Sequence, residues 1–328
     1  ARYTACHLAR HSLIQDRSTE VTQTVKLIAF PGAPNLPIFV AQEKGWFTKH
    51  GIDLQITMTP SSGYQAEALA KGEFDMAGTA FDNVVAYTEG QGAVALPETP
   101  DFFAFIGATQ IELSIIAQPQ FKSVSDLAGK ELALDAPGTG FAFVFYHMLE
   151  QGGVKPGSYE RAAVGATPSR WESVKAGTHA ATMTIEPFTS IAAAQGFNVL
   201  AKSTDTIKAY QGGCFASRRS WAKQNPEAIK GFIKAYLDGL AWVLDPANRE
   251  EASQILLRNM SDIKPGVVGS VMNSLLSPKS GLTPKGEVLI DGIRTVLDLR
   301  SRYGKPGTSL SDPHKYIDLS YYDAAVKG

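Results

Sequence analysis

Hydroxyl, amide and carboxylate side chains recur in six short loops, each of which lies between a predicted strand and a predicted helix. These loops span residues 30–37, 59–64, 79–83, 135–142, 165–171 and 184–188. In an open α/β sheet, ligands bind at the carboxyl ends of the strands. Helices that begin there present free N–H groups and a positive dipole end, which suit an anion or a polar head group. The loops therefore predict a binding site for a small molecule.

The candidate contact residues in these loops fall into two groups. The first group supplies hydrogen bonds, charge or close backbone approach: Pro31, Asn35, Ser61, Ser62, Thr79, Asp82, Asn83, Asp135, Thr139, Gly140, Ser169, Arg170 and Glu186. The second group supplies apolar walls: Phe30, Phe81, Phe141 and Trp171. Together they predict recognition of a compact solute by hydrogen bonds and apolar contact.

Several of these residues have a structural alternative. Ser62 is also a typical helix N-cap, and Phe81 and Phe141 are also typical core residues. Arg170 is predicted either to hold an anionic ligand or to pair with a surface carboxylate, and the sequence favours neither role. Glu186, at a strand end, either binds a ligand amine or hydroxyl or forms a salt bridge at a hinge.

Known catalytic motifs do not occur in the sequence. Pro137-Gly138-Thr139-Gly140 lacks the Gly-Lys-Ser/Thr ending of a phosphate-binding loop and the third glycine of the dinucleotide fingerprint. His-Glu-x-x-His, Cys-x-x-Cys and Gly-x-Ser-x-Gly patterns are also absent, and the six histidines lie outside the six loops. Near the start, Cys6, His7 and His11 lack a fourth metal ligand, so a polar tail is favoured there. We therefore predict a binding protein that is not an enzyme and needs no metal or cofactor.

The loops belong to a sequence pattern that occurs twice. Residues 172–184 resemble residues 67–79 at an offset of 105 residues, and residues 132–137 follow residues 27–32 at the same offset. Apolar spacing predicts strands near 25–30, 52–56, 75–80, 131–134, 159–164 and 179–185, with helices between them. Alternating strands and helices imply parallel pairing and right-handed crossovers. The repeat predicts two similar α/β lobes that enclose a cleft.

The chain outside the repeat has a different character. Residues 1–23 are polar and are interpreted as a tail. Beyond Gly212 and Gly213 the pattern becomes helical, and it begins with a long amphipathic helix from about 225 to 243. No third copy follows, so this C-terminal part is expected to complete the first lobe.

The composition sets outer limits on the function. The 328 residues fit about two domains of ~150 residues, and 44% hydrophobic and 19% charged residues are typical of a globular protein. A net charge of −1 argues against binding to nucleic acid or to a membrane surface. The two cysteines, Cys6 and Cys214, fit the cytosol or a disulfide-poor periplasm, and a bridge between them stays open. The initial Ala fits either a secreted protein without its signal peptide or an artificial start.

Five motifs, in their order along the chain, resemble one family of solute-binding proteins. They are Phe30-Pro31-Gly32 and residues 41–47 (AQEKGWF), 51–54 (GIDL), 68–75 (ALAKGEFD) and 126–130 (DLAGK). The resembled family serves ABC importers of nitrate, sulfonates, taurine and thiamine precursors, and the likeness covers about residues 24–245. Thr178 and His179 depart from the family, which often has an acidic residue there.

The resemblance implies a type II periplasmic-binding fold with a cleft between two lobes. One lobe would combine residues 24–113 with residues 215–328, residues 114–214 would form the other, and two crossing segments would form the hinge. It further implies a monomer without a cofactor, in the periplasm or on a lipid anchor outside the cytoplasm. A membrane ABC permease would be its partner, and nucleic acid would not.

Two ligand classes and one rival function remain open. A sulfonate-like or taurine-like anion would be held by loop hydroxyls such as those of Ser61, Ser62, Thr79 and Thr139. An aromatic, pyrimidine-type or amine-bearing compound would fit the aromatic residues and the acids Asp82, Asp135 and Glu186. The rival function is a cytosolic biosynthetic enzyme built on the same two-lobed fold, because a fold does not determine a function.

Overall fold

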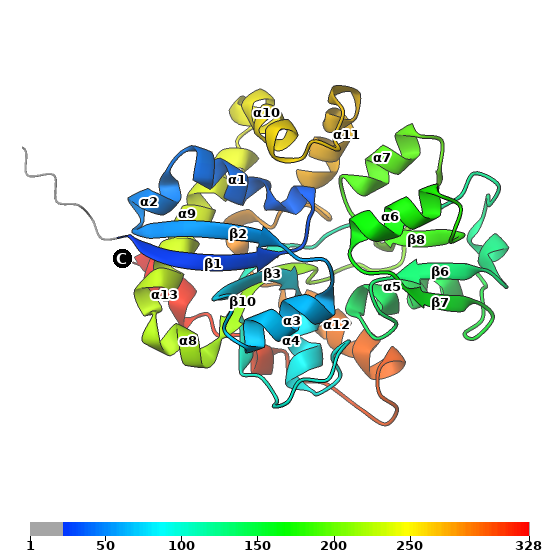
Figure 1. The fold of residues 1–328 in the computed structure, drawn as a ribbon, viewed down its shortest axis with the longest axis horizontal. Coiled ribbons are helices and arrows are strands. Elements are labelled where there is room, and N and C mark those ends of the chain that lie inside the picture. The colour runs from blue at the N-terminus through cyan, green and yellow to red at the C-terminus, as the bar shows by residue number, and fades with distance from the viewer. Residues whose placement is uncertain (1–21, 328) are drawn as a thin grey trace, which may run out of the picture.

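The computed structural model describes residues 22–327 and forms two lobes, each built on a five-stranded sheet (Figure 1). The sheet of the first lobe contains, in spatial order, β2 (Ile52–Met58), β1 (Gln23–Ala29), β3 (Met76–Ala80), β10 (Gly213–Arg218) and β4 (Phe102–Thr109). The sheet of the second lobe contains β7 (Glu160–Ala163), β6 (Glu131–Leu134), β8 (Ala181–Thr184), β5 (Ser114–Ala117) and β9 (Asn198–Lys202). Each lobe therefore has its own sheet.

The two sheets repeat one pattern of strand order and direction. In the first lobe β1 pairs in parallel with β2 and β3, and in the second lobe β6 pairs in parallel with β7 and β8. The fourth strand, β10 or β5, is antiparallel to both of its neighbours. The duplicated sequence thus corresponds to duplicated α/β units, as predicted. The parallel pairing expected among the six predicted strands is confirmed. The fourth strands were not among those six, and they run antiparallel because each enters its sheet from the opposite lobe.

Helices cover both sheets. Those of the second lobe are α5 (Gly140–Gln151), α6 (Thr167–Lys175) and α7 (Phe188–Ala194). The remaining α-helices are α1 (Leu36–Glu43), α2 (Trp46–Lys49), α3 (Ser62–Ala70), α4 (Phe81–Thr88), α8 (Arg219–Gln224), α9 (Pro226–Leu244), α10 (Arg249–Asn259), α11 (Pro265–Leu275), α12 (Ile290–Tyr303) and α13 (Ser320–Lys327). The 3₁₀ turns are Ala33–Asn35, Val124–Leu127, Ser203–Asp205, Pro246–Asn248, Pro284–Gly286 and Pro313–Tyr316.

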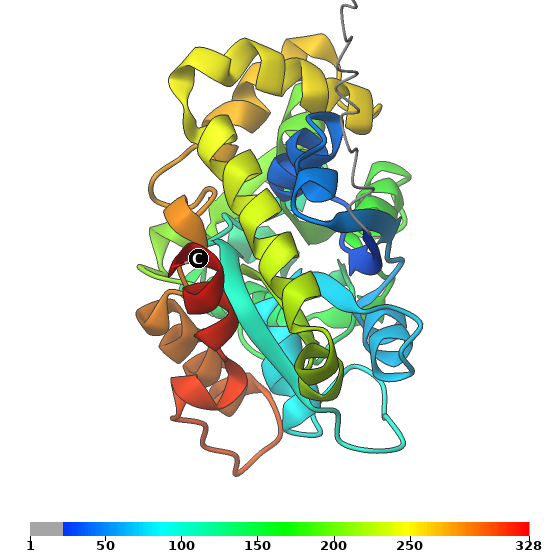
Figure 2. The same ribbon diagram turned by 90° about the vertical axis from the view of Figure 1, so that its left-hand side faces the viewer.

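The core of the first lobe depends on the long helix α9, which runs diagonally across the sheet beside α13 (Figure 2). Its apolar face buries Phe232 and Tyr236 completely. Both rings pack edge-on against Phe215 of β10, with centroids 5.0 and 4.8 Å apart. Because buried aromatic side chains contribute a large hydrophobic free energy, this contact fixes the helix on the sheet.

The two lobes also share apolar core. Helix α12 packs on α4 of the first lobe and on α5 of the second lobe. Phe143 of α5 stacks on Tyr303 of α12, with ring centroids 6.2 Å apart. The base of the interlobe space is therefore closed by packed side chains from both lobes.

Two chain segments cross between the lobes, one joining β4 to β5 and the other joining β9 to β10. Ile111 in the first segment has φ 61°, which a β-branched residue rarely adopts. Gly212 in the second segment has no room for a side chain, because a Cβ there would lie 2.2 Å from Ile111 Cγ2. The crossing segments are thus tightly packed together. The lobe boundaries expected after residues 113 and 214 stay a prediction.

Three details differ from the sequence-based expectations. Residues 213–218 were expected to begin the helical part but form β10, a short strand buried between β3 and β4. The N-cap of α3 is Ser61, not Ser62, since Ser61 Oγ accepts the Tyr64 N–H at 3.2 Å. The tail and the residues Cys6, His7 and His11 lie outside the described residues.

Candidate ligand-binding site

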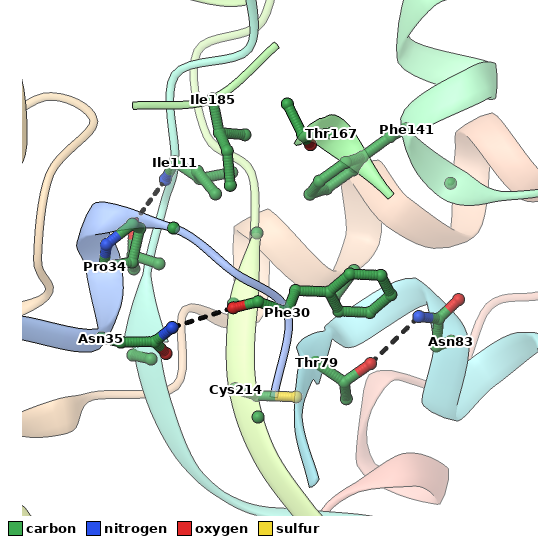
Figure 3. Close-up of a pocket in the computed structure, with 18 of the residues that line it drawn as sticks. Phe30, Pro34, Asn35, Thr79, Asn83, Ile111, Phe141, Thr167, Ile185 and Cys214 are labelled. Carbon is green, nitrogen blue, oxygen red and sulfur yellow. Dashed lines mark hydrogen bonds between the residues drawn. The ribbon is translucent and has the colours of Figure 1, made fainter. Parts of the chain in front are cut away.

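A cavity of about 90 Å³ lies between the lobes, at the carboxyl ends of their parallel strands (Figure 3). Eight predicted contact residues line it: Phe30, Asn35, Thr79, Asp135, Thr139, Gly140, Phe141 and Arg170. Asn83, also a candidate in the 79–83 loop, lines it as well. The structure therefore brings side chains from both copies of the repeat to one space between the lobes.

Eight predicted residues lie outside the cavity lining: Pro31, Ser61, Ser62, Phe81, Asp82, Ser169, Trp171 and Glu186. Phe81 is completely buried and packs edge-on against Tyr316, with ring centroids 6.5 Å apart. Ser61 caps α3, and the Ser62 backbone N–H donates to the Asp135 carboxylate at 3.1 Å. These positions shape or support the wall of the cavity.

Sequence reasoning missed the part of the lining that comes from the crossing segments and from β4 and β10. These residues include Ala108, Thr109, Ile111, Gly212, Gly213, Cys214 and Phe215. Cys214 is buried, and burial raises the pKa of its thiol far above the usual range. The pair Gly212-Gly213 was the available signal, because consecutive glycines often mark a close approach of two backbones.

The polar groups of the first lobe are organised by bonds to their neighbours. Asn35 Nδ2 donates to the Phe30 carbonyl oxygen at 2.8 Å, and Asn83 Nδ2 donates to Thr79 Oγ1 at 3.0 Å (Figure 3). With its oxygen accepting this bond, the Thr79 hydroxyl can donate, and the Asn83 amide oxygen can accept. The first lobe thus offers the ligand both hydrogen-bonding functions.

Arg170 of α6 is buried in the second lobe and is held by uncharged acceptors. Its Nε donates to Thr182 Oγ1 at 3.2 Å, and its two terminal nitrogens donate to the carbonyl oxygens of Gly165 at 2.6 Å and Met183 at 3.1 Å. A fourth bond reaches Thr167 Oγ1 at 3.0 Å. Burial lowers the pKa of the guanidinium to about 10, although Asp135 acts in the opposite direction. The proposed pairing with a surface carboxylate is not seen.

Asp135 supplies the carboxylate that faces the cavity. It is half-buried and follows β6 directly. Its oxygens accept the Ser62 N–H from the first lobe at 3.1 and 3.4 Å. Among residues 22–327 no cationic side chain lies within 4.0 Å of these oxygens. A carboxylate that accepts one backbone N–H keeps lone pairs for a ligand donor.

Hydrogen bonds join the two lobes beside the cavity. The Ala166 N–H of the second lobe donates to the Pro60 carbonyl oxygen at 2.9 Å, and the Ala33 N–H of the first lobe donates to the Glu186 carbonyl oxygen at 3.0 Å. Together with the bond from Ser62 to Asp135, these contacts join two loops of the first lobe, the one after β1 and the one after β2, to the second lobe. The structure is therefore a closed arrangement of the two lobes.

Asp82 forms a buried ion pair beneath the cavity. Arg300 of α12 donates to both carboxylate oxygens, at 2.7 and 2.5 Å, and both side chains are 1% exposed. Burial alone would lower the pKa of Arg300, but the Asp82 carboxylate outweighs burial and raises it. Arg300 also donates to the Gly138 carbonyl oxygen of the second lobe at 3.0 Å. The carboxylate predicted to bind ligand is thus fully engaged by Arg300.

Two further contacts place the second lobe against this ion pair. The Arg300 guanidinium lies 4.8 Å from the ring centroid of Phe143, within the range of a cation–π interaction. A Cβ on Gly140 would lie 2.4 Å from Asp82 Cβ. Only glycine lets the start of α5 approach the first lobe so closely.

Glu186 is neither a cavity residue nor part of a hinge salt bridge. Its carboxylate accepts the Ser190 N–H at 3.3 Å and the Ser190 hydroxyl at 3.0 Å. Burial raises the pKa of this carboxyl to about 6, and the bonds from Ser190 only partly oppose the rise. Its backbone carbonyl, not its side chain, reaches the other lobe.

The sequence profile of the NMT1-like family matches residues 18–257, which is more than half of the chain. The protein belongs to the NMT1-like family. The nitrate/nitrite binding protein NrtA of Synechocystis sp. is 23% identical over 261 residues, covering 74% of this NMT1-like chain and 58% of NrtA. The chain therefore spans less than two thirds of that relative's length.

Three solved structures share the fold. The periplasmic nitrate-binding protein NrtA from Synechocystis PCC 6803 has a TM-score of 0.78 at 18% identity, with 93% of this chain and 89% of that chain covered. The alkanesulfonate-binding protein SsuA from Xanthomonas axonopodis pv. citri, bound to MOPS, has a TM-score of 0.68 at 17% identity, with 85% and 93% covered. The desulfurization enzyme DSZB has a TM-score of 0.64 at 12% identity, with 92% and 99% covered. The predicted family and two-lobed periplasmic-binding fold are confirmed.

Two other properties concern the described part of the chain. Within residues 22–327, no three His, Cys, Asp or Glu side chains are grouped so that they could hold a metal ion. In the same range, every helix is too short or too polar to cross a membrane.

Proposed function

We propose that this NMT1-like protein is the solute-binding component of an ABC importer and works outside the cytoplasm. It captures a small organic solute when its lobes close, and the closed form is presented to a membrane permease. The observation that carries this proposal is the cavity lined by loops from both lobes and bordered by hydrogen bonds between them. Similarity to nitrate-binding and alkanesulfonate-binding proteins supports it.

An enzyme is the second candidate, because the same fold occurs in the desulfurization enzyme DSZB. Among the described residues, the cavity lining contains no histidine, and its cysteine is a buried thiol with a raised pKa. A nucleophile of this kind needs an adjacent base or a lowered pKa. The lining therefore favours reversible binding over covalent catalysis.

Two glycines that differ only in their surroundings test closure as the binding mechanism. In Gly140→Ala, the new Cβ meets Asp82 across the lobes, whereas a Cβ on Gly138 meets nothing within 4 Å. We expect Gly140→Ala to weaken binding by about fivefold to a hundredfold, since overpacking costs about 1–3 kcal/mol. Gly138→Ala should bind like the parent protein.

The measurement starts with a thermal-shift screen of sulfonates, carboxylates, pyrimidines and aromatic acids. The strongest stabiliser is then titrated by calorimetry into the parent and both variants, with small-angle scattering to follow compaction. Equal affinity for all three proteins would contradict closure. Chemical conversion of the compound, detected by mass spectrometry, would support the enzyme.

A further inference from the structure

The charges of the cavity distinguish between the two open ligand classes. We propose that the ligand is an uncharged aromatic solute whose N–H groups donate to Asp135, not a sulfonate-like or nitrate-like anion. This inference rests on the proposed binding function and concerns the same cavity. It follows from three properties of the lining: its cation, its carboxylate and its walls.

Arg170, the cationic side chain of the cavity lining, already donates hydrogen bonds to acceptors of the protein itself. Arg170 has five N–H donors, and four of them donate to Thr182, Gly165, Thr167 and Met183, which leaves one N–H on a single terminal nitrogen. Strong recognition of an oxyanion by arginine uses two parallel N–H groups of the fork. Arg170 cannot present that fork without giving up buried acceptors, each of which costs about 1–3 kcal/mol when left unpaired. It therefore supports the loop and does not receive an anion.

Asp135, the carboxylate of the cavity lining, still has lone pairs available for a ligand donor. Asp135 lines the cavity, accepts one backbone N–H from Ser62, and has no cationic side chain within 4.0 Å in the described structure. An anionic ligand would be repelled by this group in a poorly solvated space. An N–H donor would instead gain a charge-assisted hydrogen bond, which is roughly twice as strong as a neutral one. Arg170 and Asp135 together give the lining no net charge, which favours an uncharged ligand.

The walls of the cavity suit an aromatic ring. Phe30 from the first lobe and Phe141 from the second lobe face the same space, with Ile111 and Ile185 beside them (Figure 3). Aromatic rings pack well against such surfaces by stacked or edge-to-face contact. The Asn83 amide oxygen adds a second acceptor, because its nitrogen is engaged by Thr79. The combination selects a flat, apolar molecule with N–H groups.

The test compares probes of similar size and different charge. The parent protein is titrated with 4-aminopyrimidine and benzamide, which are neutral at pH 8, and with benzenesulfonate, methanesulfonate and nitrate. We expect a neutral aromatic probe to raise the melting temperature and to bind at least tenfold more tightly than benzenesulfonate. Native mass spectrometry of the freshly purified protein should show a neutral aromatic compound if a solute is retained.

Two variants assign the effect to the cavity carboxylate. Asp135→Asn preserves shape but removes the charge, and should weaken the neutral probe at least tenfold while improving benzenesulfonate. Asp262→Asn, at an exposed carboxylate outside the cavity, should change neither. Preferred binding of benzenesulfonate, methanesulfonate or nitrate would overturn this ligand class and leave the binding function standing. Failure of all five probes to bind would also overturn it, and conversion of any probe would overturn both proposals.

Discussion

The two lobes bury charge in different ways. Below the cavity, the first lobe buries Asp82 with Arg300, so each charge has an opposite partner within hydrogen-bond distance. The second lobe buries Arg170 among hydroxyl and carbonyl oxygens, and it holds the half-buried Glu186 against Ser190. When one member of a buried ion pair is removed, the other remains as an uncompensated charge. Removing a charged side chain that is held only by neutral groups leaves no such charge. The comparison teaches that burial alone does not identify a ligand contact.

The largest effect is expected from breaking the pair in the first lobe. Asp82→Ala leaves the Arg300 guanidinium buried without its carboxylate, so the free energy of unfolding should fall by about 3–5 kcal/mol. Urea denaturation of the ligand-free protein measures it. Because replacing both partners by apolar residues is often tolerated, the double variant Asp82→Leu/Arg300→Met should lose less than Asp82→Ala. A loss below about 1 kcal/mol for Asp82→Ala would contradict the view that the pair is a structural unit.

A smaller effect is expected at the arginine of the second lobe. Arg170→Met removes donors from four oxygens, but it also removes the desolvation cost of a buried guanidinium and leaves no orphaned charge. The free energy of unfolding should therefore fall by only about 1–3 kcal/mol. Urea denaturation measures this change in the free energy of unfolding. Calorimetry with benzamide and benzenesulfonate measures, in addition, how the variant binds a neutral and an anionic probe. If Arg170 receives an anion, benzenesulfonate binding should disappear in the variant while benzamide binding survives. We expect no such selective loss.

The smallest effect is expected at Glu186 and depends on pH. Its folded-state pKa of about 6 lies above the ordinary value of 4.5, so the parent protein loses stability as pH rises through this window. Glu186→Gln cannot ionise. It should therefore be about 1–2 kcal/mol more stable than the parent at pH 7, and equally stable at pH 4.

Urea denaturation at the two pH values checks the Glu186 prediction, with Glu172→Gln as the matched control. Glu172 has an exposed side chain, so its variant should show no such difference between pH 4 and pH 7. A stability difference for Glu186→Gln that is the same at both pH values would show that the carboxyl does not titrate as described.

Much of the fold was predictable, because its information is local. The repeat placed β1 to β3 and β6 to β8 correctly, and the loops after them supplied Phe30, Thr79, Asp135 and Phe141 to the cavity. Strand β4 was not assigned, since its eight residues are all buried and show no alternation. The neighbouring part of the cavity was missed with it.

The role of Asp82 was not predictable for a different reason. Its partner Arg300 lies 218 residues farther along the chain, and no local pattern connects the two. From the sequence, Asp82 opened a helix at the cleft edge and resembled a ligand contact. The fold brings α12 back to that edge, where Arg300 forms hydrogen bonds with both oxygens of the Asp82 carboxylate. Long-range pairing of this kind requires the tertiary structure.

The position of β10 has a consequence for the order in which the protein is made. β10 lies between β3 and β4 and pairs with both, yet the whole second lobe precedes it in the chain. The second sheet uses only strands between residues 114 and 202, so it can assemble during synthesis as soon as that stretch leaves the ribosome. Until β10 arrives, β3 and β4 present unpaired edges of the kind that promote aggregation. We therefore expect the second lobe to mature first, and the nascent first lobe to be the form that needs a chaperone.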